Sequence, residues 1–139
     1  MTAFQIVKNE LQRLGYSGGL LQENYVFDDA SAVQTKELRI PLGAFAQWPP
    51  NYRSACIGVI QENGNAGPQF VSSYRSFGAP MFLETHKDHV VRYRMEAAGQ
   101  AVALESIPSR NISKAFEINK NKWSPFSHKS KIFAFSKKR

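Results

Sequence analysis

The N-terminal residues carry the clearest helical pattern in the chain. Between positions 4 and 14, apolar residues recur at spacings of three and four, which places them on one face of a helix. These residues are Phe4, Val7, Leu11 and Leu14. Thr2 and Gln5 have the spacing of a capping box, and Gly15 suits the residue that follows the last helical turn. The pattern therefore predicts an amphipathic helix over residues 2–14.

Between residues 25 and 104 the chain mainly shows the patterns of β-strands. Short apolar or alternating runs, bounded by turn-forming residues, predict strands. These runs are 25–27, 37–42, 55–60, 80–83, 89–95 and 101–104. Pro41 cannot donate a hydrogen bond to a neighbouring strand, so its strand is expected at a sheet edge or to end there. The run 55–60 is apolar without alternation, which is typical of a strand buried on both faces.

The middle of the chain has the order strand, helix, strand. A turn over 62–67 follows the apolar strand, Pro68 suits the first position of a helix, and Gly78 suits its end. Because the next strand begins near residue 80, this order predicts a βαβ unit with a right-handed crossover. A hairpin across residues 86–88 is then expected to join that strand to the strand over 89–95.

These elements predict an α/β (or α+β) fold. We expect a single domain over residues 1–109, with a mixed central sheet, the N-terminal amphipathic helix and one βαβ unit. The order of elements is that of a restriction-nuclease-like layout, which is an analogy of order and does not give function. Residues 110–139 are expected to form a basic C-terminal segment, with a short helix over 112–119 followed by a poorly ordered tail.

The positive charge is concentrated at the C-terminal end of this 139-residue chain, whose net charge is +7. Residues 1–109 hold 9 basic and 10 acidic residues, whereas residues 110–139 hold 9 basic residues and only Glu117 as an acid. Such asymmetry favours a polyanionic partner, bound through phosphate contacts and counterion release. Arg92 and Arg94 alternate on a predicted strand and therefore share one face. The predicted nucleic-acid contacts are Arg92, Arg94, Lys114, Lys120, Lys122, Lys129, Lys131, Lys137, Lys138 and Arg139.

The sequence shows no sign of a membrane or a secreted protein. No apolar run reaches the roughly 18 residues of a spanning helix, and the first residues carry charges where a signal peptide needs an apolar block. Cys56 is the single cysteine, which excludes an internal disulfide. We therefore expect a reduced, cytoplasmic protein without a membrane partner, and a packed structural role for the Cys56 thiol.

The nearest match to a catalytic motif lies in the predicted loop after residue 27. A metal-dependent nuclease of this layout needs an aspartate on one strand and an acid-x-Lys motif on the next, where the carboxylates hold Mg²⁺. Asp28 or Asp29 with Lys36 comes nearest, with Gln34 in place of the second acid. The spacing is short for a metal-binding hairpin, so a plain surface loop is the alternative. We expect no cofactor unless the chain is a nuclease, in which case it would use Mg²⁺.

Two other groups of residues are candidate sites. His86 and His89 flank a turn beside Glu84 and Asp88, which suits either a transition-metal site or a polar hairpin tip. The hairpin tip is favoured, because two imidazoles without a third firm ligand make a weak metal motif. The turn 64–67 lacks the spacing of a phosphate-binding loop, which favours a simple turn.

Several runs of residues resemble a known family. They are Leu14-Gly-Tyr16, Asn24-Tyr-Val-Phe27, Ile40-Pro-Leu42, Tyr52-Arg-Ser-Ala-Cys56, Phe77-Gly-Ala-Pro80 and Asn121-Lys-Trp-Ser-Pro125. In these runs the chain resembles the N-terminal module of large bacterial polypeptides related to restriction–modification systems and adenine-specific DNA methyltransferases. The resemblance implies a leading module of a defence enzyme. The glycine-rich cofactor loop and the Asn/Asp-Pro-Pro-aromatic motif of the methyltransferases are absent, so the chain alone is not expected to methylate DNA.

Three functions are therefore open. The first is a non-catalytic nucleic-acid-binding or assembly module of such a system, with DNA as partner and a methyltransferase or helicase subunit as a further one. The second is a divergent Mg²⁺-dependent DNA endonuclease that uses Asp28 or Asp29 and Lys36. The third is a protein-interaction scaffold without affinity for nucleic acid.

Overall fold

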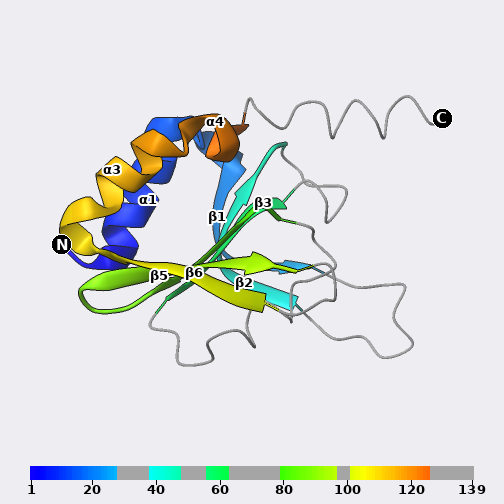
Figure 1. The fold of residues 1–139 in the computed structure, drawn as a ribbon. Coiled ribbons are helices and arrows are strands. Elements are labelled where there is room, and N and C mark those ends of the chain that lie inside the picture. Colours follow the sequence, from blue (N-terminus) through cyan, green and yellow to red (C-terminus); the bar gives the residue numbers. More distant parts are fainter. Residues whose placement is uncertain (28–37, 48–55, 63–78, 97–100, 126–139) are drawn as a thin grey trace.

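In a computed structural model, the chain forms a mixed six-stranded sheet with helices against one face (Figure 1). The structure describes residues 1–27, 38–47, 56–62, 79–96 and 101–125. This architecture confirms the expected α/β fold with a mixed central sheet and an N-terminal helix. The predicted turn over 62–67 and the helix from Pro68 to Gly78 lie outside the described residues.

The N-terminal helix, α1, spans Ala3–Leu14 and confirms the sequence prediction. Its capping box is formed as expected: the Gln5 amide donates to the Thr2 hydroxyl, and the Thr2 amide donates to the Gln5 side chain. Gly15 ends the helix with a φ of 117°, a left-handed conformation that costs glycine little. The helix buries Val7 and Leu11 completely, so its apolar face is packed on the sheet as the pattern indicated.

The six strands lie side by side in the order in which they occur along the chain. They are β1 (Leu21–Phe27), β2 (Leu38–Phe45), β3 (Cys56–Glu62), β4 (Met81–Thr85), β5 (His89–Met95) and β6 (Ala101–Pro108). All neighbours are antiparallel except β3 and β4, which are parallel. The parallel pair agrees with the predicted βαβ unit, and the hairpin between β4 and β5 is confirmed.

The expectation that Pro41 marks an edge strand or the end of its strand is wrong, because β2 lies between β1 and β3 and continues to Phe45. Pairing with β3 begins only at Leu42, so the missing amide of Pro41 falls beyond the part of β2 that pairs with β3. On the other side, Pro41 lies opposite Asn24, between two paired positions of the ladder. Asn24 has a φ of 53°, so β1 leaves regular strand geometry at the same level.

The centre of the sheet is buried on both faces, as the apolar run over 55–60 predicted. All five residues from Cys56 to Ile60 are buried. One face packs with α1 and includes Ile60, whereas the other includes Val59 beside Phe82. Gly58 leaves room for the Met81 side chain of β4, because a Cβ at Gly58 would lie 2.4 Å from the terminal methyl of Met81.

The chain after β6 returns over the sheet and packs beside α1 (Figure 1). A short 3₁₀ turn, η4 (Ser109–Asn111), leads into α3 (Ile112–Ile118) and α4 (Lys120–Trp123). The helix predicted over 112–119 is therefore confirmed. Ile112, Phe116 and Trp123 are buried in the same cluster as Val7 and Leu11 of α1. These helices thus share one core with the residues that precede position 110, and the predicted tail from 126 onward lies outside the described residues.

Candidate functional site

The catalytic candidates of the sequence cannot be placed by this structure. Asp28, Asp29, Gln34 and Lys36 all lie outside the described residues. Within the residues that the structure describes, no group of three or more His, Cys, Asp or Glu side chains could hold a metal ion. In that same part of the chain, no helix is long and apolar enough to cross a membrane.

The two arginines of β5 are both engaged in ion pairs. Arg92 Nε lies 2.9 Å from Glu105 Oε1, and its guanidinium lies 5.9 Å from the centre of the Trp123 ring. This contact places Arg92 on the sheet face that the helices cover. Arg94 follows two residues later in the strand, and its Nη2 lies 2.7 Å from Glu96 Oε1. A phosphate at either arginine would have to compete with a carboxylate, and at Arg92 also with the packing against Trp123.

A more accessible set of cations lies on α3 and α4. We call Lys114, Lys120 and Lys122 the helical basic surface, and all three residues are exposed. Lys120 lies 3.0 Å from Glu117, but both side chains are more than half exposed, so this ion pair contributes little free energy. The same helices turn Ile112 and Phe116 inward, so these two apolar residues and the three lysines face opposite ways. The remaining predicted contacts, Lys129, Lys131, Lys137, Lys138 and Arg139, lie outside the described residues.

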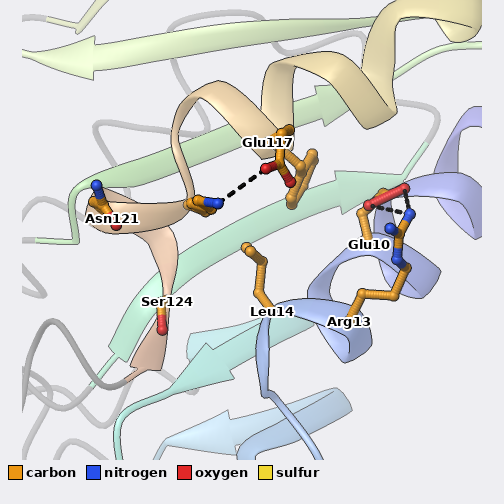
Figure 2. Close-up of a pocket in the computed structure, with 8 residues that line it drawn as sticks. Glu10, Arg13, Leu14, Glu117, Asn121 and Ser124 are labelled. Carbon is orange, nitrogen blue, oxygen red and sulfur yellow. Dashed lines mark hydrogen bonds and ion pairs between the residues drawn. The ribbon is translucent and has the colours of Figure 1, made fainter.

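A pocket of about 420 Å³ separates α1 from α3 and α4 (Figure 2). Leu14 and Phe116 supply its apolar surface, and Asn121 and Ser124 supply neutral polar groups. Two ion pairs also line it: Arg13 holds Glu10 at 3.0 Å, and Lys120 holds Glu117 at 3.0 Å. Each of these four charged side chains therefore has an oppositely charged partner at the pocket. The pocket suits a small polar group or a side chain of another protein.

The β4–β5 hairpin brings two histidines together. Their rings stack with centroids 4.5 Å apart and planes inclined by only 4°. His86 Nε2 is 2.9 Å from Glu84 Oε1, and His89 Nδ1 is 2.7 Å from Asp88 Oδ1. Each imidazole is therefore hydrogen-bonded to its own carboxylate. This pairing favours the polar hairpin tip over the transition-metal site that the sequence left open.

Glu84 is the buried member of this cluster. It is only 2% exposed, and its Oε1 also accepts a hydrogen bond of 3.2 Å from the Tyr93 hydroxyl. Burial raises the pKa of Tyr93 to about 12, and the charge and hydrogen bond of Glu84 act in the same direction. At the exposed end of the cluster, the hydrogen bond from His89 lowers the pKa of Asp88. The Glu-x-His and Asp-His spacings were visible in the sequence, but the stacking of the rings follows from the hairpin register.

Two basic residues near this hairpin were not among the predicted contacts. Lys87 lies in the hairpin turn and Arg110 in η4, and both are exposed. Within the described part of the chain, neither forms an ion pair. The sequence gave no reason to join them, since they are separated by β5 and β6.

Cys56 is a buried thiol, as expected. Its Sγ donates a hydrogen bond of 3.4 Å to the carbonyl of Gly58, and the residue is fully inaccessible to solvent. A reactive cysteine needs partial exposure, so Cys56 serves the packing of the sheet.

The chain was compared with known protein families, curated proteins and solved structures. No protein family, no curated protein and no solved structure matches this chain.

Proposed function

We propose that this chain is a non-catalytic module that binds nucleic acid, with DNA as its expected partner. The supporting observation is the division of α3 and α4 into a buried apolar side and an exposed basic side. The described residues 110–125 hold Arg110 and the three lysines of the helical basic surface against Glu117, a net charge of 4 − 1 = +3. Exposed basic side chains gathered on one side of a helix are the groups that contact phosphates of a nucleic-acid backbone.

The basic residues that follow position 125 extend the same argument. Lys129, Lys131, Lys137, Lys138 and Arg139 add five positive charges and no acid to the helical basic surface. We infer that α3 and α4 anchor this segment to the domain, since Trp123 is buried only three residues before position 126. Contacts of this kind are made to the backbone and give affinity without sequence preference.

We propose that the chain works within a restriction–modification or defence system. This part of the proposal rests on the resemblance of the sequence to the N-terminal modules of such polypeptides. A methyltransferase or helicase subunit would then supply the chemistry. The Mg²⁺-dependent endonuclease remains the alternative for a chain with Asp28, Asp29 and Lys36. Loss of plasmid cleavage on replacing both aspartates by alanine would support it.

A protein-interaction scaffold is the second candidate, and two observations favour it. Ile118 on α3 is 72% exposed, which is unusual for a large apolar side chain. It lies next to Glu117, which lines the pocket between α1 and α3. A partner that covers Ile118 and inserts a side chain into this pocket would bury both features.

Binding of a fluorescent DNA duplex to the full chain, followed by anisotropy at several salt concentrations, tests the proposed function. The Lys114→Gln/Lys122→Gln variant removes two charges from the helical basic surface. We expect it to reduce the slope of log K against log salt by about two, because each lost phosphate contact removes about 0.9. The matched control is Lys8→Gln/Arg39→Gln, which removes two charges from α1 and β2 and is expected to keep the slope.

The outcomes separate the candidates. Salt-dependent binding that weakens only in the helical variant supports the DNA module. Equal weakening in both variants would mean that net charge alone causes the binding. No binding by the full chain would contradict the proposal and favour the protein-interaction scaffold.

A further inference from the structure

A second basic site lies where the β4–β5 hairpin meets the start of η4. His89 is the strand partner of Pro108, and the Ser109 amide donates a hydrogen bond of 2.9 Å to the Asp88 carbonyl. These contacts fix the end of β6 against the hairpin. Arg110, the next residue, is thereby held beside the turn.

An open pocket of about 510 Å³ lies between these segments. Its walls are formed by Asp88, His89, Pro108, Ser109 and Arg110. The donors at this pocket are the guanidinium of Arg110, the hydroxyl of Ser109 and the imidazole of His89. Lys87 precedes Asp88 in the turn and is a second exposed cation of the hairpin. Fork-shaped guanidinium donors and hydroxyl groups are the chemistry that recognises phosphate oxygens.

The single carboxylate among these wall residues is already engaged. Asp88 Oδ1 lies 2.7 Å from His89 Nδ1, so this carboxylate oxygen already has a hydrogen-bond partner. The Asp88 side chain is 86% exposed, which leaves the rest of its charge screened by water. Arg110 and Lys87 form no ion pair within the described residues, so their charges stay available to a ligand.

We propose that this pocket, the Arg110 pocket, binds one phosphate group of the nucleic-acid backbone. The inference rests on the proposed function and deepens it, because it adds a contact site that the helical basic surface does not contain. Arg110 and Lys114 are four residues apart in consecutive helical elements, so the pocket continues the helical basic surface toward the hairpin. The pocket is open rather than enclosing, which suits a phosphate carried by a polymer better than a free anion.

The test compares Lys87→Gln/Arg110→Gln with the control Lys8→Gln/Arg39→Gln in the full chain. The first probe is a fluorescent DNA duplex. The second is inorganic phosphate, whose binding is measured by the amide chemical shifts of Asp88, His89, Ser109 and Arg110. Because both replaced side chains are exposed, the thermal unfolding midpoint should be unchanged. We expect the Arg110 pocket variant to bind DNA about tenfold more weakly, with the salt slope reduced by about one, because one phosphate contact is lost.

Each result supports or overturns the Arg110 pocket. Unchanged DNA binding in Lys87→Gln/Arg110→Gln, together with weaker binding in Lys114→Gln/Lys122→Gln, would overturn the pocket and leave the proposed function standing. If no variant and no wild-type protein binds DNA, the proposed function fails, and the phosphate titration decides. In that case, saturating chemical-shift changes at the four amides, absent in Lys87→Gln/Arg110→Gln, would show that the pocket binds free phosphate. This result would overturn the proposal that the phosphate belongs to a nucleic-acid backbone. An absence of shifts would overturn the pocket itself.

Discussion

The hydroxyl of Tyr16 donates a hydrogen bond of 2.5 Å to the main-chain carbonyl of Trp123, which lies 107 positions later. Both residues are buried, and the bond joins the end of α1 to the end of α4. Burial raises the pKa of Tyr16 well above its usual value, because the ionised phenol would lose hydration and would also lie near Cys56. The first and last described helices are therefore linked by a neutral, buried contact.

Replacing Tyr16 by phenylalanine should destabilise the protein without changing its shape. The Trp123 carbonyl would stay buried without its partner, which costs about 1–3 kcal/mol. Urea unfolding followed by Trp fluorescence measures this loss. Tyr25→Phe is a suitable control, since Tyr25 is only partly buried on the other face of the sheet. An unfolding midpoint equal to that of the wild type would contradict the importance of this hydrogen bond.

Removing the chain after residue 109 should unfold the protein, whereas removing it after residue 125 should not. The shorter chain loses Ile112, Phe116 and Trp123 from the core, and each such loss costs about 3–5 kcal/mol. The chain 1–125 keeps these residues and is expected to show cooperative thermal unfolding. Because it lacks five basic residues of the C-terminal segment, it should also bind DNA with a smaller salt slope. Cooperative unfolding of the chain 1–109 would show that α3 and α4 are dispensable for the fold.

The stability of the fold should fall between about pH 10 and pH 12. Tyr93 has a pKa raised to about 12 in the folded chain, while in the unfolded chain it ionises near its usual value of 10.0. Between these values the unfolded state has lost the proton and the folded state still holds it, so stability falls as the pH rises. Urea unfolding across this range measures the slope.

The Tyr93→Phe variant removes this titration and provides the comparison. Its stability should depend less steeply on pH above 10 than that of the wild type. At neutral pH the variant should be less stable, because the buried Glu84 loses one of its hydrogen bonds. A wild type and variant with parallel pH profiles would contradict the assignment to Tyr93.

Replacing Asp88 by asparagine should strengthen DNA binding. The change removes the carboxylate from the wall of the Arg110 pocket and leaves its donors in place. The affinity for the DNA duplex is expected to rise a few-fold at low salt. The rise should disappear at high salt, because salt screens exposed charges. Anisotropy with the DNA duplex measures it, and Glu62→Gln, which removes an exposed charge from β3, is the matched control. A gain of equal size in the control would assign the effect to net charge.

The sequence predicted the elements of this fold well where the determinants are local. The spacing of Phe4, Val7 and Leu11 sufficed for α1, because a capping box and a terminal glycine act within the same segment. The apolar run around Gly58 likewise indicated a central strand. The prediction from Pro41 was wrong because the place of its strand in the sheet depends on the neighbouring strands. Tertiary packing, not the local sequence, decides which strands are neighbours.

The candidate site was only partly visible for the same reason. Lys114, Lys120 and Lys122 could be predicted from charge alone, since a basic run on a surface helix remains exposed. Arg110 lines a pocket with Asp88, the neighbour of Lys87, only because β5 and β6 return the chain to the hairpin, which the residue pattern does not specify. The spacing of Arg92 and Arg94 predicts a shared face, but the contact of Arg92 with Trp123 depends on the packing of α4.

The single parallel seam between β3 and β4 has a consequence for how the chain folds. On each side of it lie three strands joined in antiparallel sequence, β1 to β3 and β4 to β6, whose contacts are comparatively local. β3 and β4 can pair only after the ends of the chain between Glu62 and Met81 come together. The loss of chain entropy on closing this loop therefore precedes the gain of contacts between the two strands. The two antiparallel units, β1 to β3 and β4 to β6, are therefore expected to form early in folding. The step that joins them is expected to limit the folding rate. Changes at Val59 or Phe82 in the seam should therefore mainly slow folding, with little effect on the unfolding rate.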